Sequence, residues 1–316
     1  MRIHLATLAA LLSLITLTGC TSQGRGIKDK KASGPTLTVP TPTVSTVPRL
    51  DGVAGLTLPI EAYYPLNSTM SLMANAQHQV ATNCMKRFGY TWTALPDHAR
   101  PQASHLRREY GIVDAAVAAK YGYQVPEILD EAASPSPLPP PYQLSDAETL
   151  VLTGLRPDGS AGPKTFRRQP IPKGGCLWEG LHSLTTDESG TDTADEILFA
   201  AYGRSQADPR VIAIFKKWSA CMAQSGYKYS DPMTANADPR RMTSETTASR
   251  AEIQTALADV ACKKSTNLIG TWFAIESAYE QEYIAKLLPD LNATLARYKA
   301  AAVKAAAILQ VPVPTR

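Results

Sequence analysis

Residues 84–92 read CMKRFGYTW and residues 221–229 read CMAQSGYKY. In both stretches three residues separate Cys-Met from Gly-Tyr, and a second aromatic residue follows two positions after the tyrosine. Each stretch ends a segment whose apolar residues recur at three- or four-residue steps, as they do on one face of a helix. The chain therefore contains two copies of a helix–cysteine–glycine–aromatic unit, and this repeat organises the rest of the sequence.

The cysteines fit two such units. Cys84 and Cys221 lie in the repeats, and each is followed by one more cysteine on an expected helix, Cys176 and Cys262. Of the five cysteines of the chain, Cys20 belongs to the N-terminal signal described below, which leaves four. If the chain is exported, as that signal implies, this even number indicates two disulfides, and the repeat favours the pairs Cys84–Cys176 and Cys221–Cys262. Metal binding is the alternative, but no two cysteines are close in sequence and the histidines are not clustered. We expect no metal and no cofactor.

The periodicity predicts a mainly α-helical domain built from the two disulfide-stapled helix units. Helices are expected over residues 70–88, 113–121, 145–153, around Cys176, over 193–203, from Pro209 to about 225, and almost continuously over 249–309. The pairs Ser145 with Glu148 and Ser249 with Glu252 have the spacing of capping boxes. Pro289 should kink or break the last helix. No run of alternating β-branched residues is long enough to predict a strand.

Two apolar stripes are expected on the 249–309 region. The first consists of Ile253, Leu257 and Val260, and the second runs from Leu268 through Trp272, Ile275, Tyr279 and Tyr283 to Leu287. Each stripe should face the core, because apolar side chains on one side of a helix are buried together.

The N-terminus resembles a bacterial lipoprotein signal. A charged start is followed by an apolar run over residues 5–18, and the small residues before Cys20 complete the pattern. The resemblance implies a lipid on Cys20, cleavage just before it, and residues 1–19 as the signal peptide. The mature protein would then be extracytoplasmic, lipid-anchored to the outer face of the cell membrane.

Composition divides the remainder. Residues 20–59 are rich in Thr, Pro and Ser and predict a flexible basic tether, and residues 60–316 predict the helical domain, with an internal boundary possible near 134–141. Residues 20–51 hold five basic and two acidic residues, which suits an anionic membrane surface. Residues 52–316 are balanced in charge, so we expect no nucleic-acid partner.

Trp218-Ser219-Ala220-Cys221-Met222, Gly226-Tyr227 and Asp259-Val260-Ala261-Cys262-Lys263 leading into Thr266-Asn267-Leu268 carry a family resemblance. Together with the lipoprotein signal, they resemble a group of uncharacterised lipoproteins from actinobacteria such as Streptomyces. The resemblance covers most of the domain and is strongest over residues 210–290. It implies the extracytoplasmic location and the cysteine staples, and it implies no activity.

Two sets of residues are candidates for ligand binding. The first is the repeat aromatics Tyr90, Trp92, Tyr227 and Tyr229, which either stack on a sugar or peptide or cover the disulfide-linked core. The second is three arginine pairs, Arg107-Arg108, Arg167-Arg168 and Arg240-Arg241, which either converge on phosphate, carboxylate or an anionic cell-wall polymer or are solvated surface.

No catalytic residue is predicted. Ser225 and Lys228 match Ser-x-x-Lys, but they follow a helix C-terminus, where the helix dipole opposes activation of the serine. Glu276 and Glu280 lie one turn apart on one helix and are expected to be exposed, because such a pair does not bracket a sugar. We therefore expect a binding or interaction module at the cell envelope. An envelope hydrolase with a non-local active site and a structural envelope component are the alternatives.

Overall fold

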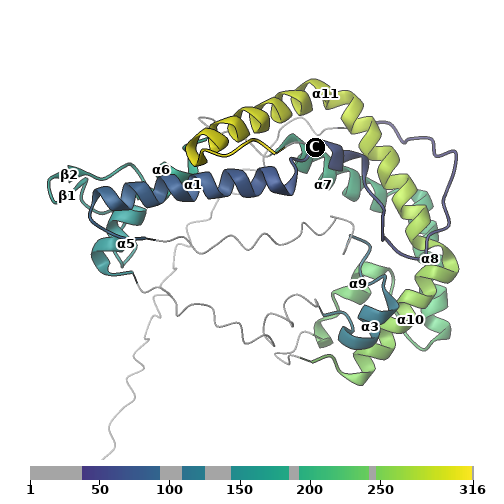
Figure 1. Cartoon of the computed structure of the whole chain (residues 1–316). Coiled ribbons are helices and arrows are strands. Elements are labelled where there is room, and N and C mark those ends of the chain that lie inside the picture. The colour runs from purple at the N-terminus through teal and green to yellow at the C-terminus, as the bar shows by residue number, and fades with distance from the viewer. Residues whose placement is uncertain (1–37, 93–108, 125–143, 185–191, 242–246, 315–316) are drawn as a thin grey trace, which may run out of the picture. The chain divides into compact units, whose positions relative to one another are not determined.

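The computed structural model describes residues 38–92, 109–124, 144–184, 192–241 and 247–314. The chain divides into two units at residues 38 and 39, and almost all described residues belong to the second, Val39–Arg316. Nine α-helices form within the described residues, and a two-stranded sheet is the largest sheet among them, so the prediction of a mainly α-helical fold is confirmed (Figure 1). None of the described helices combines the length and the apolar content needed to span a membrane.

Most of the helices lie close to the predicted segments. The helices are α1 (Asn67–Arg87), α3 (Ala115–Tyr121), α5 (Asp146–Thr153), α6 (Gly175–Leu181), α7 (Thr193–Gln206), α8 (Pro209–Gln224), α9 (Pro232–Asn236), α10 (Arg250–Thr266) and α11 (Leu268–Leu309). Helix α9 is not predicted from the sequence, and the region 249–309 forms two helices, α10 and α11. Two 3₁₀ turns, η1 (Pro59–Tyr63) and η2 (Pro239–Arg241), and the strands β1 (Thr165–Phe166) and β2 (Gln169–Pro170) complete the list.

The side chains of Ser145, Asp192 and Asp208 each cap the helix that follows them, because each accepts a backbone N–H of the first turn. After α1 and α8 the repeat glycines, Gly89 and Gly226, adopt φ values of +82° and +86°. A side chain is strained in this region, which explains why both repeats place glycine there.

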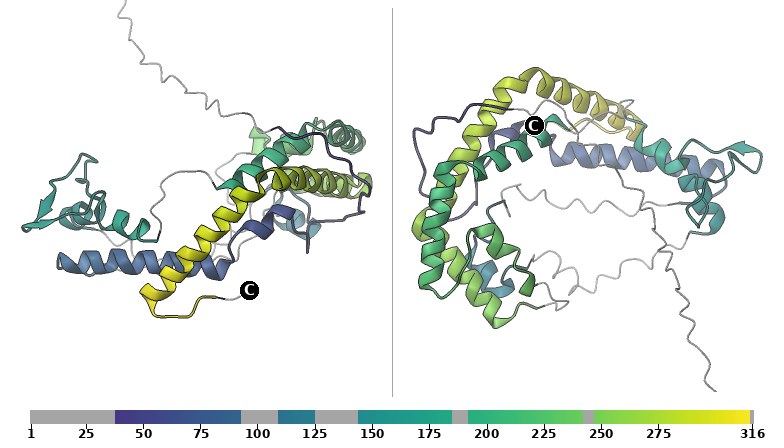
Figure 2. Two further views of the ribbon diagram at one scale, coloured as in Figure 1. Left: turned by 90° about the horizontal axis from the view of Figure 1, so that it is seen from above. Right: turned by 180° about the vertical axis from the view of Figure 1, so that it is seen from behind.

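The two disulfides connect the pairs that the repeat favoured. Cys84 of α1 is bonded to Cys176 of α6, and Cys221 of α8 is bonded to Cys262 of α10. Helix α1 packs against α6 and against the C-terminal half of α11, where an alanine-rich face lies on Leu72 and Ala76 (Figure 2). Helix α11 also packs along α7 and α8. The second stripe predicted for this region is therefore buried, with Trp272, Ile275, Tyr279 and Tyr283 in the core.

Pro289 does not break α11. The helix continues from Leu268 to Leu309 with the proline inside it, and its ribbon changes direction part-way along (Figures 1 and 2). A proline removes one hydrogen bond of the helix ladder, and tertiary packing on both sides can hold the helix across that gap.

The first predicted stripe, on α10, is only partly correct: Val260 is buried and Ile253 is half-buried, but Leu257 does not face the core. Leu257 is 36% exposed, whereas Thr255, Asp259 and Lys263 are buried. The ammonium of Lys263 lies 3.0 Å from Asp259 and donates to the carbonyl of Ile112 at 2.8 Å. Trp218 donates its indole N–H to the same aspartate at 2.9 Å. Because each buried charge finds a partner, the polar face of α10 can pack inward against α3 and α8.

The capping box predicted at Ser249 is only half formed. The hydroxyl of Ser249 accepts the N–H of Glu252, but the Glu252 carboxylate accepts the backbone N–H of Tyr123 instead of returning to Ser249. The glutamate thereby connects α10 to the residues that follow α3.

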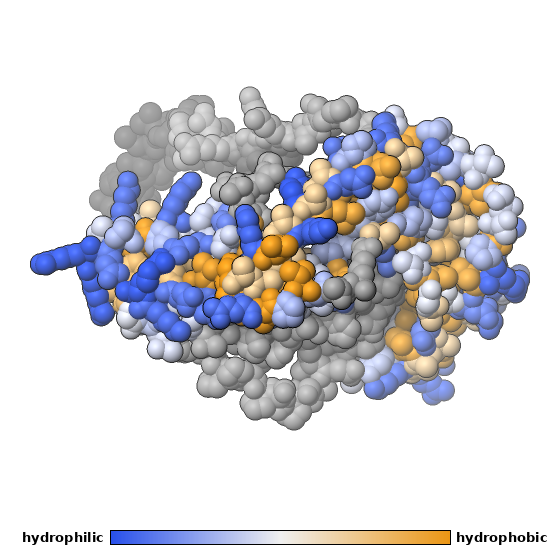
Figure 3. Space-filling model, turned by 45° about the horizontal axis from the view of Figure 1, so that its top comes forward, coloured by the Kyte–Doolittle hydropathy of each residue, from blue (hydrophilic) through white to orange (hydrophobic). Residues whose placement is uncertain are grey.

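Hydrophilic side chains project from the end of the domain that carries β1 and β2, at the left of Figure 3. This part of the molecule contains the best candidate for a functional site.

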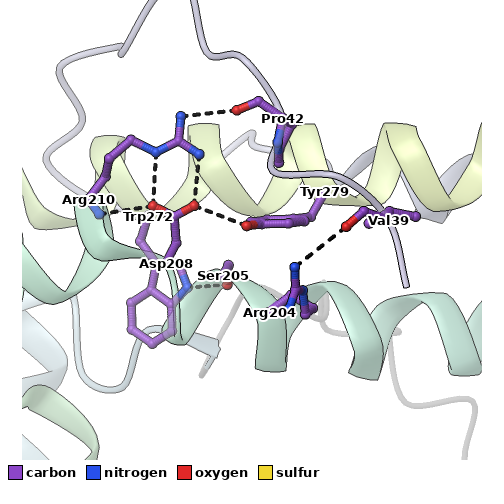
Figure 4. Close-up of polar contacts among 8 residues, drawn as sticks. All are labelled: Val39, Pro42, Arg204, Ser205, Asp208, Arg210, Trp272 and Tyr279. Atoms are coloured by element: carbon purple, nitrogen blue, oxygen red, sulfur yellow. Dashed lines mark hydrogen bonds and ion pairs between the residues drawn. The ribbon is translucent and has the colours of Figure 1, made fainter. Parts of the chain in front are cut away.

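The predicted tether is too long. Residues 39–58 lie on the helices: Val39, Pro42 and Leu58 are buried. Arg204 and Arg210 donate to the carbonyls of Val39 and Pro42 (Figure 4), and Arg210 is itself held by Asp208. Hydrogen bonds to its carbonyl groups and the burial of three side chains hold this segment against the helices. Residues 20–37 and the segment 134–141 lie outside the described residues.

The segment 39–58 has a second attachment to the helices, at Pro48 and Leu50. The side-chain amide of Asn267 donates to the carbonyl of Pro48 at 2.9 Å and accepts the N–H of Leu50 at 3.0 Å. Asn267 occupies the left-handed conformation between α10 and α11, with φ of +56°. We call residues 39–51 the strap.

Candidate functional site

The segment that contains β1 and β2 is attached to the core of the domain at both of its ends. Helix α5 ends at Gly154 and α6 begins at Gly175, and the two stretches of backbone are in contact: a β-carbon on Gly175 would lie 2.3 Å from the carbonyl oxygen of Leu152. Residues 155–174 therefore form a loop whose two ends lie side by side. Cys176 follows at once and joins this base to α1.

The loop ends in a tight hairpin. Thr165 pairs with Pro170 and Phe166 with Gln169, so Arg167 and Arg168 form a two-residue turn. Both arginines have positive φ, 49° and 65°. Such a turn favours Asn-Gly, and a non-glycine residue in this conformation costs roughly 1–2 kcal/mol. Two arginines thus occupy positions where other residues would be less strained.

The hairpin is strongly basic and carries no internal counter-charge. We define the basic hairpin as residues 164–173, in which Lys164, Arg167, Arg168 and Lys173 are all exposed. No acidic residue occurs between Asp158 and Glu179. Among the described residues, none of the four cations has an ion-pair or side-chain hydrogen-bond partner. By contrast, Arg87 at the end of α1 is paired with Glu179 at 2.6 Å.

Aromatic rings support one of the arginines. The guanidinium of Arg167 lies 5.2 Å from the ring centre of Phe166 and 5.7 Å from that of Tyr90, and the two rings are 6.0 Å apart. Tyr90 and Trp92 are half-buried against the core around Cys84 and Cys176. The repeat aromatics of the first unit therefore cover the disulfide-linked core, and Tyr90 also contacts an arginine.

The second unit brings an aromatic residue and an arginine together in a different way. The hydroxyl of Tyr229 donates to Asp238 at 2.8 Å, and Arg240 pairs with the same carboxylate at 2.6 Å. The adjacent carboxylate raises the pKa of Arg240. Tyr227 is half-buried. In the second unit, the charge of the arginine is thus neutralised by a carboxylate two positions before it.

The side chains of three of the predicted arginines are not described by the structure. Arg107 and Arg108 lie outside the described residues, and the side chain of Arg241 does too. Of the three pairs, Arg167-Arg168 is therefore the one whose two side chains are both described, and both are exposed.

Glu276 and Glu280 are buried, and the prediction that they are exposed is wrong. Burial raises the pKa of Glu280 to about 8 and that of Glu109 to about 7, and the pKa of Glu276 rises well above its ordinary value. Tyr110 donates to Glu276 at 2.8 Å, and the N–H of Ile60 donates to Glu280 at 3.0 Å. Both glutamates continue the stripe of Trp272 and Tyr283 at helical spacing, and this signal in the sequence could have revealed them.

These carboxylates would favour the hydrolase alternative if a cleft reached them. A surface pocket of about 490 Å³ is lined by residues 51–54 and 112–117, and neither Glu276 nor Glu280 borders it. Their second carboxylate oxygens are enclosed in the interior. The buried glutamates thus hold α11 against η1 and Tyr110. Within the described residues no three histidine, cysteine or acidic side chains are arranged to hold a metal.

No protein-family model, curated protein or solved structure matches this chain.

Proposed function

We propose that the protein is a lipid-anchored extracytoplasmic binding module that holds an anionic component of the cell envelope through the basic hairpin. The single observation that carries this proposal is the set of four exposed cations on one short hairpin that have no ion-pair partner among the described residues. Uncompensated charge of one sign attracts ligands of the opposite sign and accelerates their association.

The location is supported by two independent features. The lipoprotein-like signal before Cys20 would anchor the mature chain, and two disulfides suit an oxidising compartment outside the cytoplasm. Anchoring keeps the hairpin near the envelope, so a modest affinity suffices for occupancy.

The anchor is tested by Cys20→Ala. We expect this variant to be released from membranes, whereas the wild-type protein stays bound after a high-salt wash. If the variant remains in the washed membranes, the lipid anchor is wrong.

Binding is tested by co-sedimentation of the full chain with deproteinised cell-wall fragments at low salt. We expect R167A/R168A to lose about tenfold or more in affinity, because each charge-assisted contact contributes of the order of 1 kcal/mol. The matched control is K216A/K217A, which removes from α8 two exposed cations that have no ion-pair partner among the described residues. Equal retention of both double variants would refute the hairpin as the binding face.

A further inference from the structure

We propose that the basic hairpin recognises the phosphate groups of a phosphodiester polymer, with Arg167 and Arg168 each gripping a phosphate through paired N–H donors. This inference rests on the proposed function and narrows the anionic envelope component to one chemical class. It also assigns the two arginines a geometric role beyond their charge.

The first support is that the donors of both turn arginines are unused. Neither Arg167 nor Arg168 donates a hydrogen bond to a described residue. By contrast, Arg210 donates to Asp208 and to the carbonyl of Pro42, and Arg240 donates to Asp238. The planar guanidinium fork matches the two unesterified oxygens of a phosphodiester.

The second support is that Arg167 is held in place without using these donors. Its guanidinium is positioned by the rings of Phe166 and Tyr90, at 5.2 and 5.7 Å. Contact with ring faces leaves the N–H groups at the edge of the guanidinium plane available. A side chain that is already ordered loses less conformational entropy when it binds.

The donors at the turn of the basic hairpin favour a ligand with several anionic groups. Two complete guanidinium donor sets are adjacent on a two-residue turn, and Lys164 and Lys173 flank them. Each phosphodiester of a polymer presents two unesterified oxygens, which one guanidinium fork can bind through paired N–H donors. Consecutive anionic groups along one polymer chain can therefore occupy both arginines at once.

A polymer fits this surface better than a bilayer does. Stable docking on a membrane surface combines basic residues with apolar side chains that enter the acyl boundary. Within the basic hairpin no large hydrophobic side chain is exposed, and the exposed Leu155 and Trp178 lie outside it. Phe166 is half-buried, and Arg167 lies over its ring. The hairpin thus presents charge and hydrogen-bond donors without an insertion element.

The test is fluorescence anisotropy with the full chain and three probes at low salt. The first probe is a labelled glycerol-phosphate oligomer, and the second is an oligogalacturonate with the same number of charges. The third is a set of vesicles of phosphatidylglycerol and phosphatidylcholine. We expect the phosphate oligomer to bind about tenfold more tightly than the oligogalacturonate, with a logarithmic salt slope of roughly −3 for four neutralised phosphates.

The deciding variant is R167K/R168K, which keeps both charges and removes the guanidinium forks. We expect it to lose about tenfold in affinity for the phosphate oligomer, because lysine offers a point charge only. K216A/K217A should bind as the wild-type protein does.

The outcomes separate the two levels of the argument. If R167K/R168K binds as tightly as the wild-type protein, or if oligogalacturonate or the vesicles bind equally well, the phosphodiester assignment is overturned and the proposed function stands. If no probe binds, and R167A/R168A matches the wild-type protein on cell-wall fragments, both are overturned.

Discussion

The substitution Glu280→Gln should change how the stability of this protein depends on pH. Glu280 is fully buried, and its pKa is about 8 in the folded protein against an ordinary value of 4.5. Between these two values the folded protein retains a proton that the unfolded chain releases. Stability therefore falls as pH rises from 4.5 to 8, and the contribution present at low pH is lost above the folded pKa.

The size of the effect follows from the shift. At about 1.4 kcal/mol per pKa unit, the full loss is of the order of 5 kcal/mol, and about 3 kcal/mol of it falls between pH 5 and pH 8. Glutamine does not ionise, so the variant lacks this loss. Its amide oxygen can still accept the N–H of Ile60, and any remaining packing difference is independent of pH.

The assay is urea unfolding with intact disulfides at pH 5, 6, 7 and 8. The free energy of unfolding of E280Q minus that of the wild-type protein should increase by about 3 kcal/mol from pH 5 to pH 8. E282Q makes the same chemical change two residues along α11 and serves as the control. Parallel curves for E280Q and the wild-type protein would show that Glu280 is already ionised in the fold, and the argument from burial would be refuted.

Three further substitutions test other parts of the structure. R167N/R168G places the preferred residues in the strained turn and should raise the free energy of unfolding by about 1–2 kcal/mol in urea while abolishing polymer binding; an unchanged midpoint would contradict the strain. K263M leaves buried Asp259 without its ammonium and should cost about 3–5 kcal/mol in the same assay, and a loss under about 1 kcal/mol would show that the pair is not ionic. N267A removes both hydrogen bonds to the strap and should speed amide exchange at Leu50 about tenfold, whereas unchanged exchange would show that Asn267 does not hold it.

Much of the helical architecture could be predicted because its signals are local. Asp208 before Pro209 marks the start of α8, and Gly89 and Gly226 mark the ends of α1 and α8. The disulfide pairing followed from the repeat, since each repeat cysteine is bonded to the next cysteine along the chain. Capping and glycine conformation depend on a few neighbouring residues, so they survive in any tertiary context.

The errors arose where distant partners decide what is buried. Periodicity favours Leu257 as a core residue, but Lys263 donates to the carbonyl of Ile112, 151 residues away, and Asp259 accepts from Trp218, 41 residues away. These contacts draw the polar face of α10 inward. The strap was expected to be flexible from its composition, yet its carbonyls are held by Arg204 and Arg210, more than 160 residues away. No local pattern contains these partners.

The sequence predicts the residues of the candidate site but not their conformation or contacts. Arg167-Arg168 was identified as a pair, but its positive φ values and its contact with Tyr90 depend on the hairpin register and on the disulfide at its base. The sequence gives no sign that residues 155–173 leave and return at one place, because the close approach of Gly154 and Gly175 is a tertiary feature.

The two units differ most where function is expected. Both bring a repeat tyrosine to an arginine, but Asp238 neutralises Arg240 two residues away, and the first unit has no acidic residue from 159 to 178. In the first unit backbone strain and uncompensated charge coincide at Arg167 and Arg168, over a disulfide-linked core that can support both. Such costs persist where the surrounding structure over-determines a conformation, and they concentrate at functional sites. The divergence of two similar units thus favours the first as the binding unit and the second as a structural one.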